Sequence, residues 1–97
     1  MILKWFDANE AREFGISLAS FYIKRIPPGE SGKNKSLAKR QEVIRKMFEQ
    51  LARFKADHRL NIYKRAQLGN AFKWALKEAG YDTSFVDEFT KELMILS

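Results

Sequence analysis

Apolar side chains recur every three to four positions along most of the chain, and no stretch alternates apolar and polar residues over the length of a strand. This period is typical of amphipathic α-helices, which bury one face against their neighbours. The pattern predicts an all-α fold, a small four-helix, bundle-like single domain over residues 1–97. The four helices are expected at about residues 7–26, 37–57, 62–79 and 83–96. The polar, turn-rich stretch 27–36 is predicted to be a flexible loop after the first helix.

Residues that commonly begin and end helices stand at these boundaries. Asp7, with Glu10 three positions later, predicts the start of the first helix, and Pro27-Pro28 predicts its end. Asn61 is the expected cap of the third helix, and Gly80 follows its last turn. The candidate caps of the last helix are Asp82, Thr83 and Ser84.

The first predicted helix is apolar over an unusually wide arc, made by Phe14, Ile16, Leu18, Phe21, Tyr22, Ile23 and Ile26. Ala11, Gly15 and Ala19 lie four positions apart on one side, where another helix can approach the backbone closely. We therefore expect this helix at the centre of the core. An arc this wide also predicts apolar surface left over for a protein partner or a second copy.

The other three predicted helices each present one apolar face to the core. These faces comprise Leu37, Val43, Ile44, Met47, Phe48, Leu51 and Phe54 in the second helix, Ile62, Leu68, Phe72, Ala75, Leu76 and Ala79 in the third, and Phe85, Val86, Phe89, Leu93 and Leu96 in the fourth. The opposite face of the second helix alternates in charge through Lys39, Glu42, Lys46, Glu49, Arg53 and Asp57. This spacing is typical of a solvated surface with ion pairs along the helix.

The composition adds an excess of basic residues to this predicted helical fold. The 97 residues carry 18 Lys and Arg against 12 Asp and Glu, a formal net charge of +6, and contain no cysteine. The absence of cysteine excludes disulfides, zinc–thiolate sites and a cysteine nucleophile. The positive charge is local, because residues 31–65 have a balance of +8 and residues 81–97 a balance of −3. A locally basic surface is a candidate for binding a polyanion.

Two groups of residues are candidates for binding. The first is a candidate polyanion-binding set near the loop and the start of the third helix: Lys33, Lys35, Lys39, Arg40, Arg59, Lys64 and Arg65. Its simpler interpretation is a solvated run of charges. The second is an interaction strip on the back of the third helix, here called the aromatic–amide strip: Tyr63, Gln67, Asn70, Lys73, Trp74 and Lys77.

Aromatic, amide and lysine side chains together are typical of contacts to single-stranded nucleic acid. The alternative is that Tyr63 and Trp74 are packing residues under a neighbouring helix.

Other chemistry finds little support in the sequence. The loop ends in Gly32-Lys33, but Pro27 and Asn34 stand where a phosphate-binding P-loop needs glycine and a hydroxyl. His58 is the only histidine, and we expect it at a helix end in contact with a backbone carbonyl. No catalytic, cofactor-binding or metal-ligating residue is predicted, and the chain is not expected to be an enzyme.

The favoured hypothesis is a small, non-catalytic interaction module that works through protein contacts, either with a partner or as a homodimer. The alternative is a nucleic-acid-associated protein that uses the basic loop and the aromatic–amide strip. No export signal is apparent, and the longest uncharged run, Phe14–Ile23, is too short to span a membrane. We therefore expect a cytoplasmic protein that is not an integral membrane protein.

Overall fold

The computed structural model describes residues 8–30 and 37–96, which form four α-helices and no strand. The helices are α2 (Asn9–Arg25), α3 (Leu37–Asp57), α4 (Ile62–Glu78) and α5 (Thr83–Leu96), with one 3-10 turn, η1, at Pro28–Glu30. The predicted all-α, four-helix fold is confirmed; α3 and α5 have the expected bounds, and those of α2 and α4 differ from the expected ones by at most two residues. The expected cap Asp7 and loop residues 31–36 lie outside the described residues.

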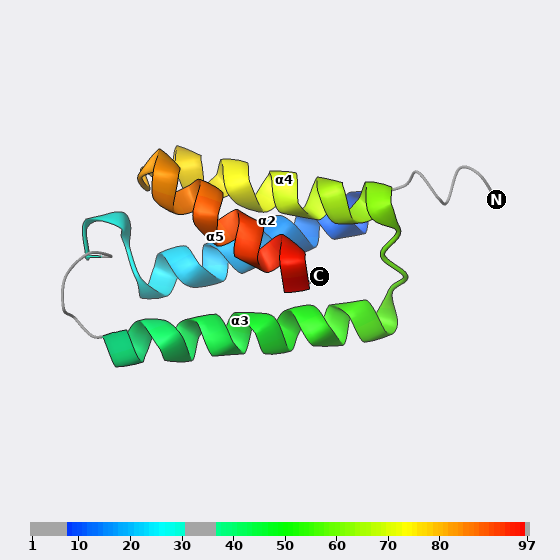
Figure 1. Ribbon diagram of the computed structural model, residues 1–97, viewed down its shortest axis with the longest axis horizontal. Coiled ribbons are helices and arrows are strands. Elements are labelled where there is room, and N and C mark those ends of the chain that lie inside the picture. The colour runs from blue at the N-terminus through cyan, green and yellow to red at the C-terminus, as the bar shows by residue number, and fades with distance from the viewer. Residues whose placement is uncertain (1–7, 31–36, 97) are drawn as a thin grey trace.

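The helices form an elongated bundle in which α2 is central (Figure 1). In this view α3 lies along one side and α4 along the other, with α2 and α5 between them. α2 and α4 run in the same direction, and α3 and α5 run in the opposite one. The principal extents are 49 × 24 × 20 Å, so the long axis follows the helices.

The polar residues at the helix ends act mainly as the sequence predicts. The Asn61 side-chain oxygen accepts a hydrogen bond of 2.8 Å from the backbone N–H of Lys64, and caps α4. Asp82 caps α5 in the same way, accepting from the N–H of Phe85 at 3.1 Å. Gly80 follows α4 with φ of +104°, a backbone conformation that favours glycine.

The core is built around α2. Its fully buried residues Leu18 and Tyr22 join Leu68, Phe72 and Leu76 of α4 and Val86 and Leu93 of α5. Aromatic rings connect these helices, because Phe89 lies edge-on to Tyr22 at 5.0 Å and to Phe72 at 5.3 Å between centroids. Edge-to-face pairs of this kind add to the stabilisation from burial alone.

The closest helix contact is between α2 and α4 at Gly15. A Cβ atom at this position would overlap the carbonyl oxygen of Leu68 and lie 3.3 Å from the backbone nitrogen of Phe72. Ala11 and Ala19, one turn away on either side, are also buried. The small-residue side of α2 is therefore the place where another helix approaches its backbone, as the spacing predicts.

Among the described residues, α3 packs against the bundle through fewer buried residues than α2 and α4 do. Val43, Met47 and Leu51 are buried, and the ring of Phe54 stacks on Phe14 of α2 at 4.2 Å. Its outer face carries ion pairs along the helix, but their centre is Arg45, which the predicted pattern does not include, and of these pairs only that of Lys46 and Glu42 joins two residues of that pattern. Arg45 contacts Glu42 at 2.6 Å and also Glu49, and Lys46 lies 3.9 Å from Glu42.

One apolar residue lies elsewhere than the sequence predicts. The helical period predicts Ile62 in the core, but this first residue of α4 is 79% exposed. Leu60, in the connection before it, packs against the core instead. Ile16 of α2 is 51% exposed, which agrees with the expectation that the wide apolar arc leaves some surface uncovered.

Replacing Gly15 with alanine is expected to lower the free energy of unfolding by about 1–3 kcal/mol, because the added methyl group has to push α4 away from α2. Urea denaturation followed by circular dichroism measures the change. The matched control is Gly29→Ala, where a Cβ atom meets nothing within 4 Å. Equal stabilities of the two variants would show that the helices do not approach this closely.

Candidate functional site

The aromatic–amide strip runs along the side of α4 opposite its buried face. Trp74 is 52% exposed and Asn70 is exposed, whereas Tyr63 is half-buried and packs against the core. Gln67 is held in place, because its side-chain oxygen accepts a hydrogen bond of 3.2 Å from Nε of Arg12 on α2. Tyr63 is therefore a packing residue, whereas Trp74 is a surface residue.

Two lysines of the strip lie against Trp74. The Nζ atoms of Lys73 and Lys77 are 5.9 and 5.3 Å from its ring centroid, within the range of a cation–π contact. Lys77 also reaches across to α5, where its Nζ lies 3.4 Å from Oδ1 of Asp87. An exposed indole with two ammonium groups beside it is thus the most distinctive feature of the described surface.

The structure does not bring the candidate polyanion-binding set together. Lys39 and Arg40 lie in the first turn of α3, whereas Arg59 lies beyond its last residue. A helix of 21 residues separates these groups by about 30 Å. Lys64 and Arg65 belong to the far end with Arg59, while Lys33 and Lys35 lie outside the described residues.

Arg40 is a packing residue in this structure. Its guanidinium carbon lies 5.0 Å from the ring centroid of Phe85 on α5, and its buried Nε has no hydrogen-bond partner among the described residues. The buried hydroxyl of Tyr22 also has no partner there, although Arg40 is close. Burial raises the pKa of Tyr22, and the Arg40 charge opposes this effect.

Tyr81 contrasts with Tyr22. Its hydroxyl donates a hydrogen bond to the backbone carbonyl of Ile26, and so ties the α4–α5 turn to the end of α2. Burial, with a smaller contribution from Tyr22, raises the pKa of Tyr81 to about 12. The Tyr81 hydroxyl therefore stays protonated near neutral pH and can donate this hydrogen bond.

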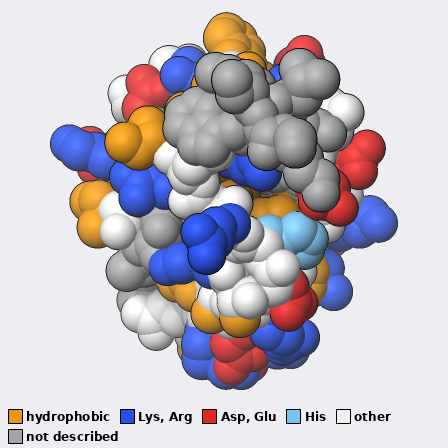
Figure 2. All heavy atoms as spheres, turned by 90° about the vertical axis from the view of Figure 1, so that its right-hand side faces the viewer, with side chains coloured by type: hydrophobic (Ala, Val, Ile, Leu, Met, Phe, Trp, Pro, Cys, Tyr) orange, Lys and Arg blue, Asp and Glu red, His pale blue; other side chains and the backbone are white. Residues whose placement is uncertain are grey.

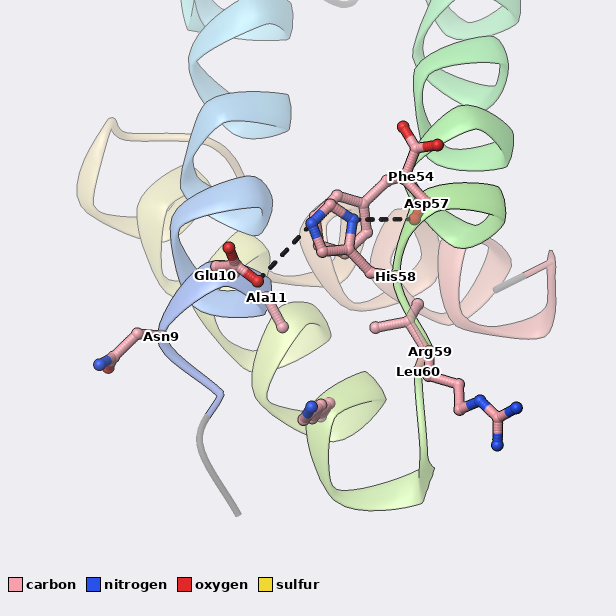
Figure 3. Close-up of a pocket in the computed structure, with 9 residues that line it drawn as sticks. Asn9, Glu10, Ala11, Phe54, Asp57, His58, Arg59 and Leu60 are labelled. Atoms are coloured by element: carbon pink, nitrogen blue, oxygen red, sulfur yellow. Dashed lines mark hydrogen bonds and ion pairs between the residues drawn. The ribbon is translucent and has the colours of Figure 1, made fainter. Parts of the chain in front are cut away.

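The end of the molecule where α3 connects to α4 carries a hollow of mixed charge and not a uniformly positive patch. Figure 2 shows this end of the molecule, with Lys and Arg side chains around the histidine and acidic side chains among them. The hollow has a volume of about 560 Å³, and its lining includes Glu10, Asp57, His58, Arg59 and Lys64. Arg59 points away from it (Figure 3). This mixed charge does not select an anion.

His58 joins the start of α2 to the end of α3. Its Nδ1 lies 3.2 Å from the backbone carbonyl of Phe54, which confirms the expected contact at a helix end. Its Nε2 lies 3.6 Å from Glu10, and its ring stacks on Phe54 at 4.2 Å (Figure 3). These contacts account for the position of His58 without a ligand.

The described residues contain neither a grouped set of metal ligands nor a membrane-spanning helix. Within residues 8–30 and 37–96, no three His, Asp or Glu side chains are grouped so as to hold a metal ion. In the same residues, each helix is too short or too polar to cross a bilayer. Comparison with protein-family models, with curated proteins and with solved structures finds no match for this chain.

Sequence reasoning missed two residues that shape the strip. Arg12 fixes Gln67 from 55 positions away, and Asp87 pairs with Lys77 from the next helix. Neither pairing follows a local spacing, because each depends on which helices become neighbours in the fold.

Replacing Tyr81 with phenylalanine is expected to cost about 1–2 kcal/mol of stability, because it leaves the Ile26 carbonyl without its donor. Tyr22→Phe is the matched control, since it removes a buried hydroxyl that makes no hydrogen bond to the described residues. Denaturant unfolding of both variants gives the comparison. If Tyr22→Phe lowered the stability as much as Tyr81→Phe, the stabilising role of the hydrogen bond from Tyr81 to Ile26 would be contradicted.

Proposed function

We propose that the protein is a non-catalytic binding module that takes single-stranded nucleic acid on the aromatic–amide strip of α4. The observation that supports this proposal is the exposure of Trp74 beside two lysines. A large exposed ring offers a stacking surface to any unpaired base, and nearby ammonium groups neutralise phosphate. Duplex DNA does not present the faces of its bases, so its bases cannot stack on Trp74.

The neighbours of Trp74 favour one path for the strand. Lys73 and Lys77 lie on the α5 side of the ring, whereas the exposed carboxylate Glu78 lies on the other side. The sugar–phosphate backbone would follow the lysine side and avoid Glu78. The amides of Asn70 and Gln67, one and two turns before Trp74, can then meet the polar edges of the adjacent bases.

Arg12 extends this surface beyond α4. Its Nε holds Gln67 at 3.2 Å, and its guanidinium also donates to Asn9 at 2.8 Å. The amide of Gln67 is therefore presented in one orientation, which lowers the conformational entropy that binding has to remove. Basic charge accordingly lies at both ends of the strip.

A protein partner or a homodimer is the second candidate, and the exposure of Ile16 on α2 supports it. Ile16 borders a shallow hollow of about 520 Å³ whose lining includes Phe21 of α2 and Gln50 of α3. This support is limited, because α4 and α5 bury most of the apolar arc of α2. The other large exposed apolar residues, Ile62 and Ile95, lie singly on different helices, which is common on monomeric proteins.

Replacing Trp74 with alanine is expected to weaken binding of a 20-nucleotide oligothymidylate at least fivefold, because loss of a stacking ring costs about 1–3 kcal/mol per base. Fluorescence anisotropy of a labelled oligonucleotide measures the affinity at several salt concentrations. Trp74→Phe should retain most of the binding, since phenylalanine keeps an aromatic face.

The matched control is Ile95→Ala, which removes a 73% exposed apolar side chain on α5 and should leave the affinity unchanged. A duplex of the same length should bind more weakly than the single strand. Absence of binding at low salt, or equal affinities of wild type and Trp74→Ala, would overturn the proposal. Sedimentation that shifts with protein concentration would favour the homodimer instead.

A further inference from the structure

The contact between Lys77 and Asp87 links the strip to the acidic last helix. Lys77 Nζ lies 3.4 Å from Oδ1 of Asp87, and the exposed fractions of the two side chains are 23% and 55%. The lysine stem is therefore packed along the α4–α5 seam, while the carboxylate is open to solvent. The ammonium group sits where it can contact either this carboxylate or an incoming anion.

We infer that Asp87 competes with phosphate for Lys77, and that this competition makes the strip select ligands with unpaired bases over bare polyanions. The inference rests on the proposed function of the strip. A carboxylate and a phosphate are both oxygen anions, and an ammonium group binds either as a point charge. Asp87 thus occupies the position that a phosphate of the bound strand would take.

The strength of the pair allows this exchange. Because the Asp87 carboxylate is open to solvent, water screens the pair, and surface ion pairs of this kind contribute only about 0.2–1 kcal/mol. A base stacked on Trp74 places its own phosphate beside Lys77 at a high effective concentration, and this phosphate can then replace Asp87. A polyanion without bases lacks this local attachment and has to compete from solution.

The other acidic residues nearby are less well placed to act in this way. Glu88 and Glu92 are exposed on α5 and have no ion-pair partner in the described part of the chain. Glu78 is exposed on α4, on the side of Trp74 away from the lysines. Asp87 alone among these four carboxylates contacts a lysine of the strip.

The test compares the wild type, Asp87→Asn and Glu88→Gln with two probes, a 20-nucleotide oligothymidylate and long-chain inorganic polyphosphate. Glu88→Gln is the matched control, because it removes the same charge from the same helix without freeing Lys77. Asp87→Asn is expected to tighten polyphosphate binding by about two- to fivefold, and oligothymidylate binding by less. The slope of log affinity against log salt should change little for the oligonucleotide, because a phosphate of the bound strand contacts Lys77 in the wild type as well.

Equal effects of Asp87→Asn and Glu88→Gln would overturn the inference. If oligothymidylate binding still depended on Trp74, the proposed function would stand without it. Absence of oligothymidylate binding to both the wild type and Asp87→Asn at low salt would overturn the inference and the proposed function together. A larger gain for polyphosphate than for oligothymidylate, confined to Asp87→Asn, is the result that supports it.

Discussion

The arrangement of this protein depends on how closely α4 approaches α2. Glycine at position 15 leaves no side chain between the two helices, so the backbone of α4 at Leu68 rests directly on α2. This contact fixes which face of α4 is buried: Leu68, Phe72 and Leu76 face inward. The opposite face is turned to solvent as a consequence, and Trp74 lies on it.

The same packing explains why the excess positive charge does not form one surface. The residues with the largest positive balance lie on α3 and its flanks, and α3 spans about 30 Å between its two ends. Arg45 and Lys46 are paired with acidic residues of the same helix, and Arg40 packs over Phe85. The basic groups beside an exposed ring are instead on α4. Net charge alone is therefore a poor guide to where this protein would bind an anion.

Much of the fold could be predicted from the sequence, because it depends on local signals. The period of apolar residues, the cap at Asn61 and the glycine at position 80 define helices that are correct to within one or two residues. The central position of α2 also follows from its wide arc and small-residue side. The prediction for Ile62 is wrong because helical period alone does not show whether the first residue of a helix is covered by its neighbours.

The candidate site was less predictable, because it depends on contacts between helices. The sequence places Tyr63 and Trp74 on one strip, but only the packing of α4 shows that Tyr63 contacts the core and Trp74 does not. The spacing that joined Arg40 to Arg59 in one basic set carried no information on the length of helix between them. Similarly, no local pattern pairs Lys77 with Asp87.

The central claim is that the solvent-facing side of α4 is the binding surface. Nuclear magnetic resonance of the labelled protein, titrated with a short oligothymidylate, tests it most directly. Binding at this surface should shift the Trp74 indole N–H and the amides of Asn70, Lys73 and Lys77 progressively, with little change at the hollow around His58. Shifts confined to that hollow or to the exposed side of α2 around Ile16, or no shifts at all, would contradict it.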